Sequence, residues 1–209
     1  MQHSPAMVPT MVDDVALSDH ARGMFETDDE LDDLDALLTK SFAGAGAHLT
    51  EIITGDRRLS ARDLVRYLEG TRHFVVATVT RAGEPRCSAV DGLFLHGRLW
   101  FTTSGDAVKA KHLEQRSTLS AAHVMGDDVG VFIHGHARVV PGGPGEADAF
   151  RHYWTELYDA SPEDWVATPQ DARYVEVLAT SIFTYAFNRE RFEAMMNEVA
   201  RPSGDGSQS

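Results

Sequence analysis

The chain has 209 residues and a net charge of −13 at pH 7, with 43% hydrophobic residues and a single cysteine. This composition predicts one folded domain with appendages, excludes an internal disulfide, and disfavours nucleic acid as a partner because acidic surfaces repel phosphate backbones. No apolar run approaches the ~20 residues that span a bilayer, and the first residues lack the basic and apolar regions of a signal peptide, so we expect a cytoplasmic protein without membrane contact.

The first 40 residues carry ten acidic residues against two basic ones. Residues 1–27 show no periodicity and are predicted to form a disordered acidic tail. From Asp28 onward, leucines at helical spacing follow acidic residues that favour a helix N-terminus, so residues 28–58 are predicted to form an N-terminal helical extension. Another helix is predicted to begin after Ser60, a favourable N-cap residue, and to end at Gly70.

The next part of the chain has the composition of strands. Residues 73–80, 86–96 and 98–104 are rich in β-branched and aromatic residues. Short turns separate them, among them His96-Gly97, so the three strands are predicted to form an antiparallel meander.

A short helix is predicted over residues 106–115, capped near Ser104 or Asp106. It is followed by strands at 118–125 and 129–140, a helix at 144–158, one or two strands within 173–187, and a terminal helix at 189–200. Five to seven antiparallel strands with inserted helices favour a small barrel, so the predicted fold class is mainly β (α+β).

Two lysines stand out at the junction between the third strand and the helix after it. Lys109 and Lys111 are two of only three lysines, whereas 16 of the 19 basic residues are arginines. They follow Thr102, Thr103 and Ser104 at the end of a strand. Hydroxyl groups, free amides at a helix N-terminus and ammonium groups together make an anion site. The alternative, left open by the residues alone, is that both lysines are solvated charges on a helix face.

The segment FVVATVTRAGEPRCSAVDGLFLHGRLWFTTSGDAVKAKHL resembles the pyridoxamine 5'-phosphate oxidase-like family of split β-barrels, which includes flavin- and deazaflavin-dependent oxidoreductases. The pattern is a strand, a polar turn with Gly and Pro, the run Ser88-Ala89-Val90, a hairpin at Gly97, and a Thr-Thr-Ser strand end before Lys-x-Lys. VFIHGHARVV and YVEVLATSIFTYAF resemble later strands of the family. The resemblance covers about Leu59 to Arg191.

This resemblance implies an antiparallel split β-barrel of the FMN-binding type over residues 59–191, with peripheral helices, followed by a C-terminal helix end and polar tail over residues 192–209. It also implies a homodimer that holds FMN or the deazaflavin coenzyme F-420 between two barrels. By the same resemblance, the phosphate is held by hydroxyl and basic residues, and the ring lies along the second strand. The matching cofactor-binding positions are Ser88, Ala89, Val90, Thr103, Ser104, Lys109 and Lys111.

The implied activity is hydride transfer to or from a small organic substrate. No catalytic residue is predicted, because the cofactor carries that chemistry. The chain lacks the Arg-rich strand and the C-terminal arginine/histidine segment of the vitamin B6 oxidases, so oxidation of vitamin B6 is not expected. Two alternatives stay open. One is a haem-binding split barrel with His134 or His136 as ligand, and the other is a non-catalytic protein that binds a flavin or another anion.

Several other residues carry side chains that could take part in chemistry. Cys87 is predicted to be a small buried residue rather than a redox group. Asp91-Gly92 fits either a polar contact near the cofactor or a β-bulge. No metal site is predicted, although His134 and His136 share one strand face and His123 is expected on a neighbouring strand. The three tryptophans are expected in the core or at a dimer surface: Trp100, Trp154 and Trp165. The alternative is that Trp154 or Trp165 lines a substrate mouth.

Overall fold

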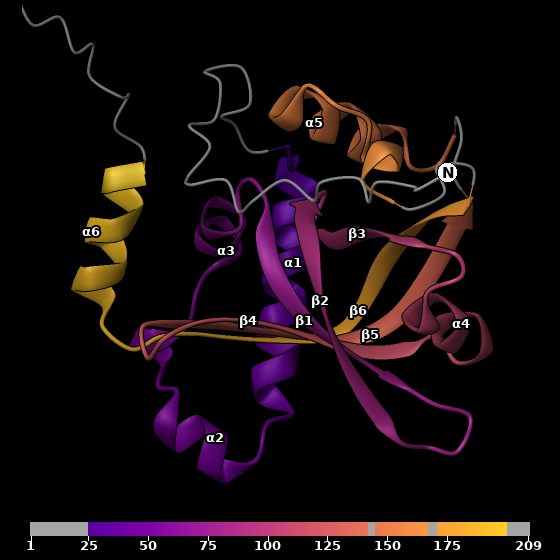
Figure 1. The fold of residues 1–209 in the computed structure, drawn as a ribbon. Helices are drawn as coiled ribbons and strands as arrows, with labels where there is room; N and C mark the ends of the chain where they lie inside the picture. The colour runs from indigo at the N-terminus through magenta and orange to yellow at the C-terminus, as the bar shows by residue number, and fades with distance from the viewer. Residues whose placement is uncertain (1–24, 142–144, 167–170, 200–209) are drawn as a thin grey trace, which may run out of the picture.

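The computed structural model describes residues 25–141, 145–166 and 171–199 (Figure 1). Most of the tail predicted for residues 1–27 lies outside this part of the chain, as do residues 200–209 and part of the glycine-rich turn at 141–146. The helices are α1 (Asp28–Ala43), α2 (Ala47–Ile52), α3 (Ala61–Tyr67), α4 (Val108–Gln115), α5 (Asp148–Tyr158) and α6 (Arg189–Val199), with short 3-10 turns η1 (Gly55–Arg57) and η2 (Pro162–Trp165). The strands are β1 (Arg72–Val79), β2 (Pro85–Leu95), β3 (Arg98–Ser104), β4 (Thr118–Met125), β5 (Val129–Pro141) and β6 (Ala172–Ala186).

The six strands of the described chain form one barrel in the order β1-β2-β3-β6-β5-β4, and β4 pairs with β1 to close it. Every pairing is antiparallel, which confirms the predicted mainly β barrel with peripheral helices. The meander is also confirmed. Its turn between β2 and β3 places His96 and Gly97 at φ values of 53° and 70°, the left-handed conformation that a tight hairpin requires.

The barrel is split between β2 and β3. These strands pair only where Gly92–Leu95 runs beside Arg98–Phe101. Before Gly92, β2 pairs with β1 alone, and beyond Phe101, β3 pairs with β6 alone. One edge of β2 over residues 85–91 therefore has no strand partner within the described chain. We call this stretch the split edge.

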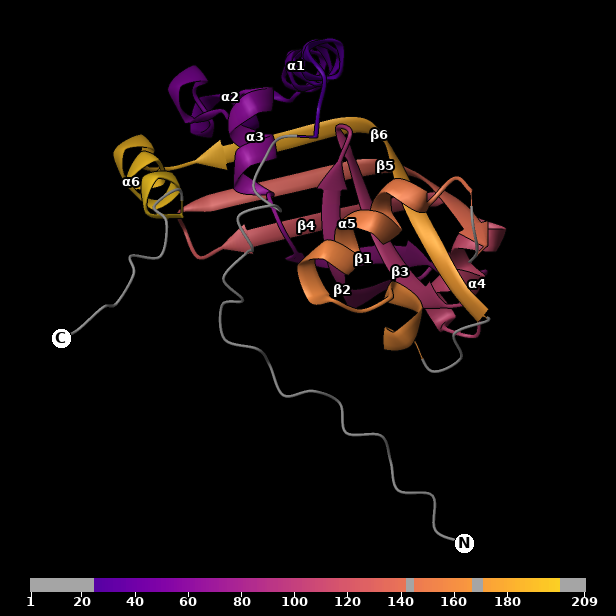
Figure 2. The same cartoon turned by 90° about the horizontal axis from the view of Figure 1, so that it is seen from above.

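Two apolar clusters hold the helices on the barrel. The larger fills the barrel and extends under α1, α3 and α6, with Phe74 and Phe101 among its most buried residues. The smaller lies outside the barrel, where Leu93, Trp100 and Tyr174 pack against α5. Figure 2 shows α1 beside β6 and α5 over β2 and β3. The inward and outward faces of the strands are thus both used for packing.

The predicted N-terminal extension is anchored to β6 by polar contacts as well as apolar ones. Ser41 on α1 accepts a hydrogen bond from the Ile182 backbone N–H (2.9 Å) and donates one to the Leu37 carbonyl oxygen (2.7 Å). Just before α3, the Leu59 N–H donates to the Thr184 hydroxyl oxygen (3.1 Å). These contacts give the buried backbone groups partners, which is why the extension packs as part of the folded unit.

The helix predicted from Asp28 is confirmed as two helices, because the chain turns at Gly44 to Gly46 between α1 and α2. The segment predicted as one or two strands forms the single strand β6. Its pairing with β5 shifts register once: His134 pairs with Ser181 and Gly135 with Ala179, so Thr180 is an extra residue on β6 at this point. Among the described residues, no helix combines the length and apolar character needed to cross a bilayer.

Candidate functional site

The junction between β3 and α4 depends on a close backbone approach. The Gly105 N–H donates to the Asp171 carbonyl oxygen (2.8 Å), and a Cβ at Gly105 would lie 2.5 Å from the Asp171 carboxylate. The predicted cap at Ser104 or Asp106 is wrong, since the N-cap residue is Ala107, whose side chain makes no capping bond. The first amides of α4 consequently have no side-chain cap and point out of the helix start.

Lys109 lies half-buried in this junction. Its Nζ is 3.5 Å from the Thr103 hydroxyl oxygen, and within the described part of the chain it forms no ion pair with a carboxylate. Burial lowers the pKa of Lys109 from its ordinary value because the ammonium loses hydration. The Ser104 Oγ, on the opposite face of β3 from the Thr103 side chain, is buried without a hydrogen-bond partner among the described residues. We call Thr103, Ser104, Gly105 and Lys109 the α4 corner.

The structure separates the two lysines of the predicted site. Lys111 lies two residues beyond Lys109, which places it on another face of the helix, and it is exposed. His112, three residues beyond Lys109, shares the face of Lys109, and its Nδ1 lies 3.0 Å from the Thr78 hydroxyl oxygen on β1. The sequence reading missed His112, although its spacing from Lys109 already indicated a common face.

Ser88, Ala89 and Val90 all lie on the split edge. Their side chains do not share a face: Val90 is buried toward the barrel interior, Ala89 is exposed on the outer face, and Ser88 is half-buried. What the three residues share is a backbone edge without a strand partner in the described chain. Because alternate residues of an antiparallel strand direct their N–H and C=O groups away from the paired neighbour, this edge offers hydrogen-bonding groups to a flat ligand.

Cys87 is exposed on the outer face of β2, so the prediction of a buried cysteine is wrong. The cause is the split, because residues 85–91 lie beyond the region that α5 covers.

Asp91 lies at the end of the same face and is partly exposed. Its carboxylate lies 2.7 Å from the His73 Nδ1. The β1–β2 register is continuous through Gly92, so the β-bulge reading is wrong. A Cβ at Gly92 would lie 2.8 Å from the Phe74 ring, which explains the glycine.

The histidines fall on two faces of the barrel wall. His134 and His136 on β5 lie on the outer face, with their Nδ1 atoms near the hydroxyl groups of Ser120 (2.8 Å) and Ser117 (3.2 Å). His123 on β4 lies on the opposite face, where burial lowers its pKa. Within the described residues, no group of three or more His, Cys, Asp or Glu side chains could hold a metal ion.

The three tryptophans divide between core and surface. Trp100 and Trp154 are buried in the smaller cluster, as expected. Trp165 is 45% exposed, and its ring lies 5.3 Å from that of Tyr158 at the end of α5. Trp165 is therefore the tryptophan whose position fits a surface or substrate-mouth role.

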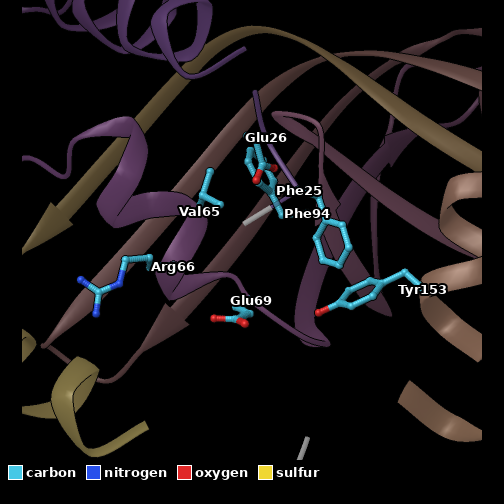
Figure 3. Close-up of a pocket in the computed structure, with 7 residues that line it drawn as sticks. All are labelled: Phe25, Glu26, Val65, Arg66, Glu69, Phe94 and Tyr153. Atoms are coloured by element: carbon cyan, nitrogen blue, oxygen red, sulfur yellow. The ribbon is translucent and has the colours of Figure 1, made fainter. Parts of the chain in front are cut away.

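A small cavity has none of the seven predicted site residues in its lining; Figure 3 shows the residues that do line it. Its volume is about 10 Å³, room for about one water molecule, and we call it the Glu26 cavity after one of its lining residues. Its lining comes from four parts of the chain: the segment before α1, α3 with the residues just after it, β2 and α5. The lining residues are Phe25, Glu26, Val65, Arg66, Glu69, Phe94 and Tyr153.

Comparison with known proteins identifies relatives of this chain. A sequence model of the family described as pyridoxamine 5'-phosphate oxidase matches residues 61–186. Among solved structures, a conserved hypothetical protein from Mycobacterium tuberculosis matches with a TM-score of 0.54 at 17% identity, over 75% of this chain and 99% of that one. The haem storage protein HutZ from Vibrio cholerae matches with a TM-score of 0.52 at 14% identity, over 59% and 93%.

An F420 reductase also matches, with a TM-score of 0.45 at 21% identity, over 55% of this chain and 91% of that one. No curated protein matches the chain. At these identities, the two structures with TM-scores of 0.54 and 0.52 show a shared fold.

Proposed function

The chain belongs to the pyridoxamine 5'-phosphate oxidase family, and from this membership we propose that it is an oxidoreductase that binds FMN or the deazaflavin coenzyme F-420. In this proposal it transfers hydride to or from a small organic substrate. The α4 corner holds the cofactor phosphate, and the split edge holds the ring. The observation that carries the proposal is the half-buried Lys109, which contacts the Thr103 hydroxyl and has no carboxylate partner in the described chain.

The residues of the α4 corner fit a phosphate group. A buried hydroxyl without a partner is destabilising, and so is an ammonium group that has lost hydration without gaining an anion. A phosphate would supply acceptors to the Thr103 hydroxyl and to the Lys109 ammonium at once. The uncapped amides at the start of α4 add further donors, and the Ser104 hydroxyl lies at the same strand end. Lys111, exposed on the opposite side of the helix, would act at longer range.

The ring of such a cofactor would supply the hydride chemistry. The chain's own residues bind and orient it: the backbone of Ser88, Ala89 and Val90 offers donors and acceptors along the split edge, and the small Ala89 side chain leaves the outer face open. The His73–Asp91 pair lies two residues farther along the same face, where a substrate would approach. No side chain is assigned a catalytic role.

The proposal includes a homodimer formed through the outer face of the sheet. Val75 on β1 and Val124 on β4 are 50% and 51% exposed, and Ala122, which pairs with Val75, lies on the same face. An apolar sheet face of this kind is typical of a protein interface. Sedimentation of the wild type and of Val75→Glu tests it: a monomeric wild type would remove the dimer from the proposal.

The test of the function is a titration of the purified apo protein with FMN, the deazaflavin and haem, followed by absorbance and fluorescence. We expect FMN or the deazaflavin to bind, and Lys109→Ala to weaken that binding while leaving thermal stability unchanged. A haem-only response would favour the outer-face histidines His134 and His136 as ligands instead. If a flavin-type cofactor binds, bleaching of its absorbance in a substrate screen separates an oxidoreductase from a non-catalytic binder.

A further inference from the structure

Two charged residues that the predicted site did not include lie against the strand end of the α4 corner: Asp171 just before β6, and Arg173 near its start. Arg173 pairs directly with Thr103 in the antiparallel register of β3 and β6. Side chains of directly opposite residues project from the same face, with Cβ atoms about 4.5–5.5 Å apart. Arg173 therefore projects on the face of Thr103, whose hydroxyl contacts the Lys109 ammonium (3.5 Å).

Gly105 makes room for the carboxylate that holds Arg173. The Gly105 N–H donates to the Asp171 carbonyl oxygen (2.8 Å), and a Cβ at Gly105 would lie 2.5 Å from the Asp171 Oδ1. The same Oδ1 lies 2.9 Å from the Arg173 Nη2. The carboxylate thus occupies the space that a side chain at residue 105 would fill, and it keeps the guanidinium of Arg173 beside the end of β3.

The Arg173 guanidinium keeps donors that the protein does not use. Its side chain is 27% exposed, and within the described residues it contacts the Asp171 carboxylate and, through Nη1, the Ala172 carbonyl oxygen (3.2 Å). A guanidinium has five N–H donors in a planar fork that matches two oxygens of a phosphate. These two contacts leave three N–H donors without an acceptor in the described chain. Arg173 is therefore able to bind an anion without leaving Asp171.

We propose that Arg173 is a second cationic ligand of the cofactor phosphate at the α4 corner, and that Asp171 positions it. This inference rests on the proposed function, in which the phosphate lies beside Lys109 and Thr103. The two cations flank the Thr103 hydroxyl and donate to the same phosphate. Because its guanidinium is already held in place, Arg173 loses little freedom when the phosphate binds.

The charges at this place give Asp171 two opposing effects. Lys109 and Arg173 each carry a positive charge, whereas Asp171 and the exposed Asp106 in the turn each carry a negative one. Asp171 orients the guanidinium, but its charge also repels a phosphate. In Asp171→Asn, the amide oxygen still accepts from Arg173 and the repulsion is gone. That variant should therefore bind phosphate more tightly, an effect that a purely structural ion pair would not produce.

The test compares the Tm of full-length variants in inorganic phosphate and in chloride of the same ionic strength. We expect a Kd on the order of 10 mM for inorganic phosphate. At ten times that concentration, the rise in Tm should be about 2–4 °C larger in the wild type than in Arg173→Gln. The general stabilisation by phosphate salts is common to all variants, so the comparison removes it. Asp171→Asn should bind about three- to tenfold more tightly than the wild type.

The matched control is an arginine–aspartate pair at the other end of the barrel. There the Arg191 Nη1 lies 3.1 Å from the Asp128 carboxylate, and Figure 1 shows α6 far from α4. Arg191→Gln and Asp128→Asn make the same changes of charge, and both should respond to phosphate like the wild type. Titration with FMN and the deazaflavin should give about tenfold weaker binding in Arg173→Gln, with Arg173→Lys in between because it keeps the charge but not the fork.

Equal phosphate responses of Arg173→Gln and the wild type would overturn the proposal, and so would weaker phosphate binding by Asp171→Asn. If a cofactor binds Arg173→Gln as tightly as the wild type, the proposed function stands and the role of Arg173 is wrong. If neither cofactor binds the wild type but Arg173→Gln loses its phosphate response, the role of Arg173 stands and the proposed function is wrong. Should Arg173→Gln fail to fold, Arg173→Lys serves in the same comparisons.

Discussion

The α4 corner and the Glu26 cavity both remove polar groups of the protein from water without giving them a partner, but the groups have opposite charge. In the α4 corner, a half-buried cation has no anion among the described residues, whereas in the Glu26 cavity a buried carboxylate oxygen has no donor among them. The corner lies within the segment shared with the family, and the cavity needs residues that precede it. Unsatisfied polar groups of opposite sign therefore occur at two separate places on one small barrel.

The largest effect is expected at the α4 corner. Lys109→Ala should weaken binding of FMN or the deazaflavin by about 10–100-fold, because a charge-assisted hydrogen bond contributes about 1.5–3 kcal/mol. Lys111→Ala, on an exposed helix face, should weaken it by less than about threefold. Cofactor titration of both variants checks this. Equal losses in the two variants would contradict the separation of the lysines.

The next largest effect is a loss of stability, expected when the hydrogen bond between Ser41 on α1 and β6 is removed. Ser41→Ala removes the acceptor of the buried Ile182 N–H, which should lower the free energy of unfolding by about 1–3 kcal/mol. Thr50→Ala is the control, since its exposed hydroxyl bonds only to the Ala47 carbonyl oxygen within α2. Urea unfolding measures both variants. Cofactor binding should stay intact in both variants, and an equal loss of stability in the two would contradict the anchor.

A smaller effect is expected at the cap of α1, one residue beyond Glu26. The Thr27 hydroxyl accepts from the Glu30 N–H, and the Glu30 carboxylate accepts from the Thr27 N–H. Thr27→Ala should lower the free energy of unfolding by about 1 kcal/mol. Ser60→Ala removes the equivalent cap of α3 and should lower the free energy of unfolding by a similar amount. Urea unfolding measures both variants, and an unchanged midpoint in Thr27→Ala would contradict the cap.

The smallest effect is a pH dependence at the α4 corner. Burial lowers the pKa of Lys109 below 10.5, so its ammonium form is lost at a lower pH in the folded protein than in the unfolded chain. Cofactor affinity should fall by a few fold as pH rises through that lowered pKa. The unliganded protein should instead gain stability there, since the unfolded chain still binds the proton. Titrations from pH 7 to pH 10 check this, and Lys109→Arg, which keeps its charge, should give a flat profile.

Much of the fold follows from local patterns in the sequence. The His96-Gly97 turn fixes the hairpin, the Ser60 cap fixes the start of α3, and short turns between β-rich segments require antiparallel neighbours. The cap of α4 was mispredicted because Ser104 remains in β3 and the close approach to Asp171 decides where the chain turns. That approach joins residues far apart in sequence, so no local pattern contains it.

The candidate site was predictable in part. The strand end and Lys109 could be placed together from their order in the chain, and the structure brings Thr103 and Lys109 into contact. The exposure of Cys87 depends on where α5 ends over the barrel, which local patterns do not encode. The Glu26 cavity was missed because Glu26 belongs to an acidic stretch that reads as solvated, and its burial needs packing against β2 and α5.

The split edge also bears on how this protein behaves in concentrated solution. A strand edge with free backbone groups is a template on which another chain can add a strand. Pro85 has no backbone N–H to donate and Arg86 carries a charge, so both disfavour strand addition at the start of the edge. The stretch from Cys87 to Val90 carries no charge. A ligand that covers that stretch would block strand addition and so reduce aggregation. Protein saturated with FMN or the deazaflavin should therefore stay in solution at concentrations at which the ligand-free protein precipitates.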